Sequence, residues 1–136
     1  MRTNQRNNLA ETARHERGAQ NTDVYAVKAR NYKGLRRGSP VFCRNNWHIH
    51  HAKSGGGQIL VCVAGRGYYQ EWGKPAQELR PGSVVNITVG VKHWHGAAPN
   101  SWFSHLVVEV PGDETSNEWL EAVDNTVYFK ASGKEV

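Results

Sequence analysis

Short β-type segments separated by glycine- and proline-containing turns dominate the chain after residue 57. Turns such as Gly65–Gly67 and Arg80–Gly82 leave no room for a long helix between them. Many short strands at regular spacing are typical of a sandwich or a barrel, and 136 residues suffice for one domain with its own core. The pattern therefore predicts an all-β fold. The predicted strands are Gln58–Ala64, Tyr68–Trp72, Ala76–Leu79, Val84–Ile87, Val91–Ala97 and Trp102–Val110.

The positive charge of the chain is concentrated at its N-terminal end. Residues 1–40 hold nine Lys/Arg and three Asp/Glu, whereas residues 41–136 hold eight and nine. We therefore predict a basic N-terminal arm over residues 1–40, containing at most one short strand at Thr22–Ala29, and a β-domain over residues 41–136. A solvated tail explains the arm more simply than nucleic-acid binding, which we keep as an alternative.

The cysteine content and the hydropathy pattern indicate the compartment. Cys43 and Cys62 cannot build a disulfide framework, and Cys62 lies in an apolar run typical of a buried thiol. No run of 18 apolar residues is present, and the charged N-terminus is not followed by an apolar stretch. We therefore expect a cytoplasmic protein with neither a membrane span nor a secretory signal.

Histidines concentrate on or beside the predicted strands. Residues i and i+2 of a strand point to the same face, so His48 converges with His50, and His93 converges with His95. His51 is expected to face the other way. Imidazole suits Zn, Fe, Mn, Ni or Cu, and an additional oxygen ligand shifts the choice towards Mn or Fe. Two such pairs in one small β-domain predict a metal site.

The first histidine pair lies in a stretch that resembles the first motif of the cupin family. That motif has His-x-His, then Glu or Gln, then Gly seven positions later; here these are Trp47–His50, Gln58 and Gly65. Seven residues separate His50 from Gln58, where three or four are usual. The glycines of Lys53–Gly57 can absorb the extra length.

The second histidine pair lies in a stretch that resembles the second cupin motif. Gly82, Gly90 and His93 match it, and the resemblance as a whole covers about residues 44–123. It is to small single-domain cupins of the cupin 2 type associated with carboxymuconolactone decarboxylases, a group that includes manganese-dependent hydroxynitrile lyases. This resemblance implies a cupin barrel, which is a double-stranded β-helix or jelly roll. Residues 1–40 do not match the family.

A short C-terminal helix is expected after the barrel. Thr115-Ser-Asn-Glu118 reads as a capping box in front of Trp119 and Leu120, so the helix is predicted to start there.

Carried over residue by residue, the resemblance implies the metal ligands His48, His50, Gln58 and His93. Three neutral nitrogens and one amide oxygen leave one or two positions open, as in a reactive metal site. Because Gln58 replaces the commoner Glu, the ion keeps its full +2 charge. The implied cofactor is a divalent metal, manganese first, with iron, zinc and nickel as alternatives.

Two further histidines are candidates for catalysis. His95 shares a face with His93, and without a metal bond of its own it can exchange protons near neutral pH. His105 lies on the following strand, with Glu109 at the same parity. In the lyase relatives, residues that match His95 and His105 face the pocket. The alternative for each is a buried histidine with a satisfied hydrogen bond.

Three classes of function follow from these features. The first is a metal-dependent enzyme with lyase or isomerase chemistry on a small oxygenated molecule; oxygenase chemistry would instead need Fe, Cu or Ni. The second is a non-catalytic cupin that binds a small ligand through its metal. The third is nucleic-acid binding by the arm. The aromatic residues favour a core or a homodimer interface over a substrate platform. Because small cupins commonly pair through such faces, the resemblance implies a homodimer.

Overall fold

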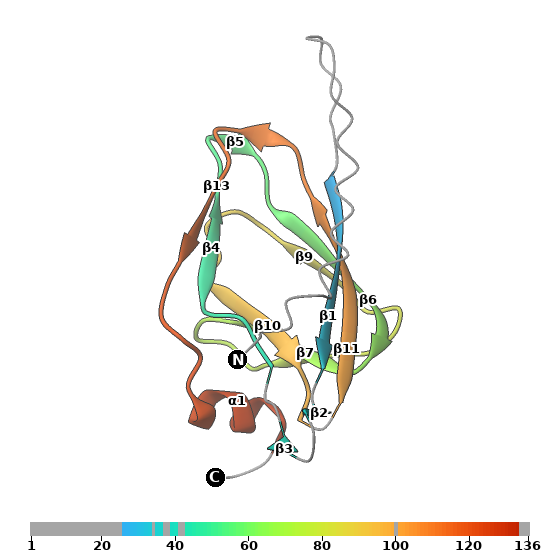
Figure 1. Ribbon diagram of the computed structural model, residues 1–136. Helices are drawn as coiled ribbons and strands as arrows, with labels where there is room; N and C mark the ends of the chain where they lie inside the picture. Colours follow the sequence, from blue (N-terminus) through green and yellow to red (C-terminus); the bar gives the residue numbers. More distant parts are fainter. Residues whose placement is uncertain (1–25, 34, 37–38, 41–42, 100, 134–136) are drawn as a thin grey trace, which may run out of the picture.

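Two antiparallel β-sheets face each other and form the body of the protein (Figure 1). The computed structural model describes residues 26–33, 35–36, 39–40, 43–99 and 101–133, with side chains from residue 43 onward. The all-β prediction is confirmed, and each strand predicted after residue 57 is present to within two residues at each end.

The first sheet has the strand order β1-β11-β6-β9 and the second has the order β13-β4-β10-β7-β8. Two small two-stranded sheets pair β5 with β12 and β2 with β3. The strands of the first sheet are β1 (Ala26–Lys33), β11 (Trp102–Glu109), β6 (Gln58–Gly65) and β9 (Val84–Ile87). Those of the second are β13 (Ser116–Trp119), β4 (His48–His51), β10 (His93–Ala97), β7 (Gly67–Glu71) and β8 (Gln77–Leu79). The small sheets contain β5 (Ser54–Gly55), β12 (Gly112–Asp113), β2 (Leu35–Arg36) and β3 (Ser39–Pro40).

Strand β1 lies before the boundary predicted at residue 40. It pairs with β11 in antiparallel register from Ala26 opposite Glu109 to Lys33 opposite Trp102. The predicted strand Thr22–Ala29 overlaps β1 only in its second half, and residues 22–25 lie outside the described residues. The division into an arm and a domain stays a prediction, but the sheet begins at Ala26 at the latest.

The short C-terminal helix is present, but it begins later than the capping box predicted. Residues 116–119 form β13, which pairs with β4, and α1 spans Asn125–Ala131. Pairing along the edge of β4 provides hydrogen-bond partners for the backbone of residues 116–119, and this pairing overrides the local capping signal. The N-cap is Asp124, whose carboxylate accepts the Val127 N–H at 2.8 Å. Within the described part of the chain, no helix is long and apolar enough to cross a membrane.

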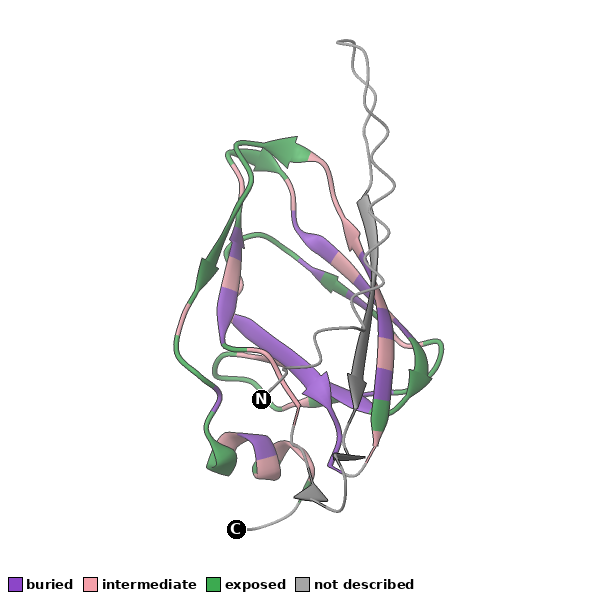
Figure 2. Cartoon of the chain, viewed as in Figure 1, coloured by how far each residue is buried: buried purple, intermediate pink, exposed green. Residues whose placement is uncertain are grey.

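Strand alternation separates the interior from the surface. The inner residues of β6 and β11 are buried, among them Leu60, Cys62 and Phe103, and they pack in one cluster between the sheets. Strand β10 is buried along its whole length (Figure 2). Its inner side chains face the first sheet, whereas Trp94 on its outer face packs beneath α1 against Tyr128. The Tyr128 hydroxyl donates to the Ala97 carbonyl at 2.5 Å, which fastens the helix to β10.

Gly65 ends β6 where the chain turns into β7. Its φ is +74°, and a Cβ there would collide with the backbone carbonyl of Trp102. Gly73 has nearly the same φ, +77°, but nothing lies within 4 Å of its would-be Cβ. The motif glycine is therefore required by close backbone approach as well as by its dihedral angle.

We expect Gly65→Ala to destabilise the protein far more than Gly73→Ala. The positive φ costs each variant about 1 kcal/mol, and only Gly65→Ala must also push β11 away, which should bring its total cost to about 3 kcal/mol or more. Urea unfolding of both variants measures the difference. Equal losses of unfolding free energy would show that the close approach of β6 to β11 does not require glycine at position 65.

Candidate metal centre

Three histidines from two adjacent strands of the second sheet converge inside the barrel. His48 and His50 come from β4, and His93 comes from β10, directly opposite His48. One ligand atom from each lies within 4.8 Å of the others. All three residues are buried, with exposures of 2%, 6% and 0%. The period of two along each strand produces this convergence, as predicted.

Each of these imidazoles is oriented by an oxygen atom at its Nδ1. Because carbonyl and amide oxygens only accept, each Nδ1 must carry the proton, and each Nε2 keeps its lone pair. The three bonds hold the rings before any ion binds. They join His48 to the Asn46 carbonyl at 2.8 Å, His50 to the Asn117 side-chain oxygen at 2.7 Å, and His93 to the Val91 carbonyl at 2.8 Å.

The Nε2 lone pairs of these histidines make the site suitable for a cation. Nε2 of His50 and Nε2 of His93 are fully buried and have no hydrogen-bond partner among the described residues. A buried acceptor left without a partner costs about 1–3 kcal/mol, so two of them side by side need an explanation. Three imidazole nitrogens facing one point are a common donor set for divalent metals, and the residues present fit such an ion.

Burial also keeps His48 and His93 unprotonated at neutral pH. The pKa of His48 is lowered to about 4 and that of His93 to about 3, chiefly by desolvation on burial, and the charges of neighbouring histidines act in the same direction. Metal binding requires neutral imidazole, so protons compete with the metal at these two residues only in acid.

The stability of the metal-free protein should therefore fall as the pH is lowered from about 6.5 to about 4. In this window the unfolded chain takes up protons at positions 48 and 93 and the folded chain does not, so acid favours unfolding. Each histidine can contribute up to about 1.4 kcal/mol per pH unit. Urea unfolding with a chelator at pH 7.5, 6.5, 5.5 and 4.5 measures the slope, and His93→Gln should reduce it. A flat profile would contradict the neutral, desolvated site.

Gln58 reaches the same interior from the opposite sheet. It begins β6, is 7% exposed, and faces inward. Its Nε2 donates to the Glu109 carboxylate on β11 at 2.6 Å. Its role as the fourth ligand stays a prediction.

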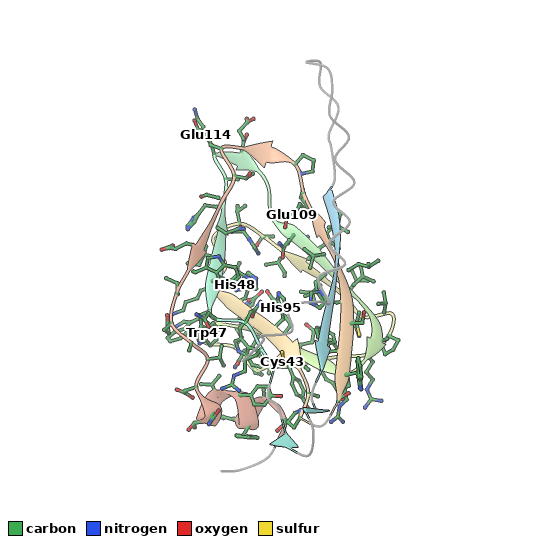
Figure 3. All side chains as sticks on the ribbon, in the orientation of Figure 1. Cys43, Trp47, His48, His95, Glu109 and Glu114 are labelled. Carbon is green, nitrogen blue, oxygen red and sulfur yellow. The ribbon has the colours of Figure 1, made fainter. Side chains whose placement is uncertain are left out.

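His95 and His105 are also buried and lie beside the cluster. Their ring centroids are 4.9 Å apart, and the His95 ring is 5.7 Å from that of His48. Figure 3 shows His48 and His95 in the space between the sheets. The Asn45 amide holds His95 twice, with its Nδ2 3.0 Å from Nε2 and its Oδ1 accepting the backbone N–H at 2.9 Å. Their catalytic role stays a prediction.

The protonation state of His95 differs from the sequence-based expectation. Burial, together with the charges that His105 and the metal-site histidines would carry, holds its pKa well below the usual value. At neutral pH His95 is therefore an unprotonated base and not a group in mid-titration.

A cavity of about 530 Å³ opens beside the cluster. His50 lines it together with Glu109, Thr115 and Asn117, at the end of the barrel formed by β5 and β12. The long Lys53–Gly57 segment builds this rim, since β5 pairs there with β12. His51 faces outward as expected and pairs with Glu118 at 2.9 Å on the surface.

Three polar residues that touch the site were not among its predicted members. Asn45, Glu109 and Asn117 contact His95, Gln58 and His50 respectively. Glu109 lies an even number of residues after His105 on β11, and this spacing could have predicted an inward side chain. Asn117 was assigned to a helix N-terminus, and Asn45 precedes the motif without a pattern of its own.

Comparison with known proteins gives relatives of matching architecture, although no protein-family model matches the chain. The (R)-mandelonitrile lyase of Granulicella tundricola is 39% identical over 85 residues, which are 62% of each protein, so the chain matches less than two thirds of that relative. The DMSP lyase DddQ of Ruegeria pomeroyi is 23% identical over 72% of this chain and 44% of that one, with a TM-score of 0.55, and is alike in fold alone.

A cupin-like protein of Thermotoga maritima matches more completely. It is 34% identical, and the match covers 85% of this chain and 94% of that one at a TM-score of 0.57. Identity of this extent, together with the two facing sheets and the three inward histidines, shows that the chain is a small cupin 2 type member of the cupin family.

Proposed function

We propose that this cupin is a metal-dependent enzyme with lyase- or isomerase-like chemistry on a small oxygenated molecule. The observation that carries the proposal is the pair of buried Nε2 atoms on His50 and His93, which have no hydrogen-bond partner in the part of the chain that the structure describes. A purely structural core would not retain two desolvated acceptors without a partner. The name of the mandelonitrile lyase relative favours lyase chemistry.

The proposed ligands are His48, His50, Gln58 and His93, with manganese as the native ion. A set of three imidazoles and one amide oxygen favours manganese or iron over zinc, because oxygen ligands suit the harder ions. When bound, the ion would supply Lewis-acid polarisation of a hydroxyl, carbonyl or carboxylate oxygen of the substrate.

In this proposal His95 and His105 carry out the proton transfer. An unprotonated His95 can take a proton from a substrate hydroxyl, and the Asn45 amide fixes the ring in one orientation. His105, 4.9 Å away between ring centroids, stabilises or shares the resulting charge. The small substrate would enter from the cavity that His50 and Glu109 line.

Metal analysis and turnover together test this function. Protein purified without chelator is analysed for metals by mass spectrometry, then assayed with (R)-mandelonitrile by the absorbance of released benzaldehyde. About one manganese or iron per chain together with turnover supports the enzyme. Bound metal without turnover of any small hydroxy or carbonyl compound would favour the non-catalytic ligand-binding cupin, and absence of metal after manganese or iron is added would refute the site.

The homodimer also remains a proposal. Exposed apolar side chains, Val63, Val84 and Trp102, lie on strands of the first sheet, with exposures of 46%, 58% and 56%. Such a face supports self-association.

A further inference from the structure

The sheet register places a carboxylate directly opposite the proposed oxygen ligand. In the ladder between β11 and β6, Glu109 is the partner of Gln58, so both side chains lie on the inner face. Among the described residues, Gln58 is the hydrogen-bond partner of the Glu109 side chain. Other described glutamates of the barrel pair with a basic group: Glu71 with Lys74, Glu78 with Arg66 and Arg80, and Glu118 with His51.

A carboxylate can only accept, so this contact fixes which way the amide points. The 2.6 Å bond requires the NH₂ group of Gln58 to face Glu109, which leaves the amide oxygen as the atom available to a cation. The reverse orientation would bring two oxygens into contact at Glu109 and turn N–H donors towards the metal site. Glu109 therefore excludes the orientation in which Gln58 would repel a metal.

The same carboxylate sits at the boundary between the metal site and the cavity. Glu109 is half-buried and lines the cavity with His50, and Figure 3 shows it towards the end of the barrel that holds β5 and β12. The Gln58 amide carries no charge, but Glu109, to which it is hydrogen-bonded, places a negative charge next to it. A charged hydrogen bond of this kind is stronger than a neutral one and raises the electron density on the amide oxygen.

We propose that Glu109 is a positioning residue that holds Gln58 as an oxygen donor to the metal and returns one negative charge to the site. This inference rests on the proposed function, in which Gln58 is a ligand. Outer hydrogen bonds of this kind typically change metal affinity by about 10- to 100-fold.

Calorimetric titration of the metal-free full-length chain with Mn²⁺ and, separately, Zn²⁺ tests the proposal. Glu109→Gln and Glu109→Ala should each bind about 10-fold more weakly or worse than the unmodified chain. The matched control is Glu118→Gln, which removes the same charge from a glutamate that pairs with the outward-facing His51. It should leave affinity unchanged. Thermal unfolding monitored by circular dichroism verifies that each variant is folded.

A second background separates positioning from a general structural effect. In Gln58→Glu the ligand is itself a carboxylate and faces Glu109, so adding Glu109→Gln supplies an amide donor to orient it. Loss of the Glu109 charge acts in both backgrounds, whereas loss of the orienting contact acts only where residue 58 is an amide, so we expect Glu109→Gln to weaken binding more in the original chain than in Gln58→Glu. Equal losses of affinity in the two backgrounds would show that Glu109 does not orient Gln58 and would overturn the proposal.

The remaining outcomes are also decisive. If the unmodified chain binds metal and both Glu109 variants bind it equally well, the positioning role is wrong and the proposed function stands. If the unmodified chain binds neither Mn²⁺ nor Zn²⁺, both are overturned.

Discussion

Replacement of His93 by alanine is expected to abolish stoichiometric metal binding. His93 is fully buried opposite His48, and its Nε2 has no other partner among the described residues. Its loss leaves two imidazoles on one strand and opens one side of the site. The affinity should fall by well over the roughly 100-fold that follows loss of a hydrogen bond to a ligand. Mass spectrometry of protein purified without chelator, followed by titration with Mn²⁺, measures this.

The control for this variant is His51→Ala. His51 is adjacent to the cluster in sequence, but its side chain faces solvent and pairs with Glu118. It should therefore retain about one metal per chain. Retention of the metal in His93→Ala, in a protein that remains folded, would refute the three-histidine centre and move the search to other residues.

Replacement of His95 by alanine is expected to keep the metal and remove turnover. The His95 ring contacts the Asn45 amide and lies outside the group of three histidines whose ligand atoms converge. Loss of a general base typically costs about 10²- to 10⁴-fold in rate. The measurement is kcat on (R)-mandelonitrile, or on whichever substrate the activity screen identifies, beside metal content for the same preparation.

Asn45→Asp is the informative companion to His95→Ala. A carboxylate at this position would favour the protonated ring, so it should shift the acid limb of the pH–rate profile towards higher pH while metal content stays constant. Unchanged kcat in His95→Ala would exclude His95 as the base and leave His105 as the candidate.

The convergence of the inward histidines could be predicted because it depends only on local geometry. Alternation along a strand is independent of the rest of the fold, so the pairs at 48 and 50 and at 93 and 95 converge in any extended segment. The same alternation places His51 outside. The spacing from Gln58 to Gly65 carried the family resemblance, and Gly65 has a backbone reason to be glycine.

The partners of those histidines could not be predicted, because they depend on pairing between distant strands. Asn117 faces His50 across the β13–β4 ladder, 67 residues away in sequence. The capping signal in Thr115–Glu118 was local and was overridden by that ladder. Likewise, the contact between Glu109 and Gln58 follows from the β11–β6 register and not from the sequence near either residue.

The ladder between β13 and β4 has a consequence for the order of events during synthesis. A chain that has emerged as far as β11 already carries all three ligand histidines, but the β4 edge that holds two of them is still unpaired. An open edge of this kind invites pairing with another chain. Only when Ser116–Trp119 emerges does Asn117 reach His50 and close that edge. The same late step therefore orients the His50 ring and protects the β4 edge from aggregation. Because pairing between strands so far apart in sequence is slow, the interval before it is the stage of folding at which the chain is most prone to aggregate.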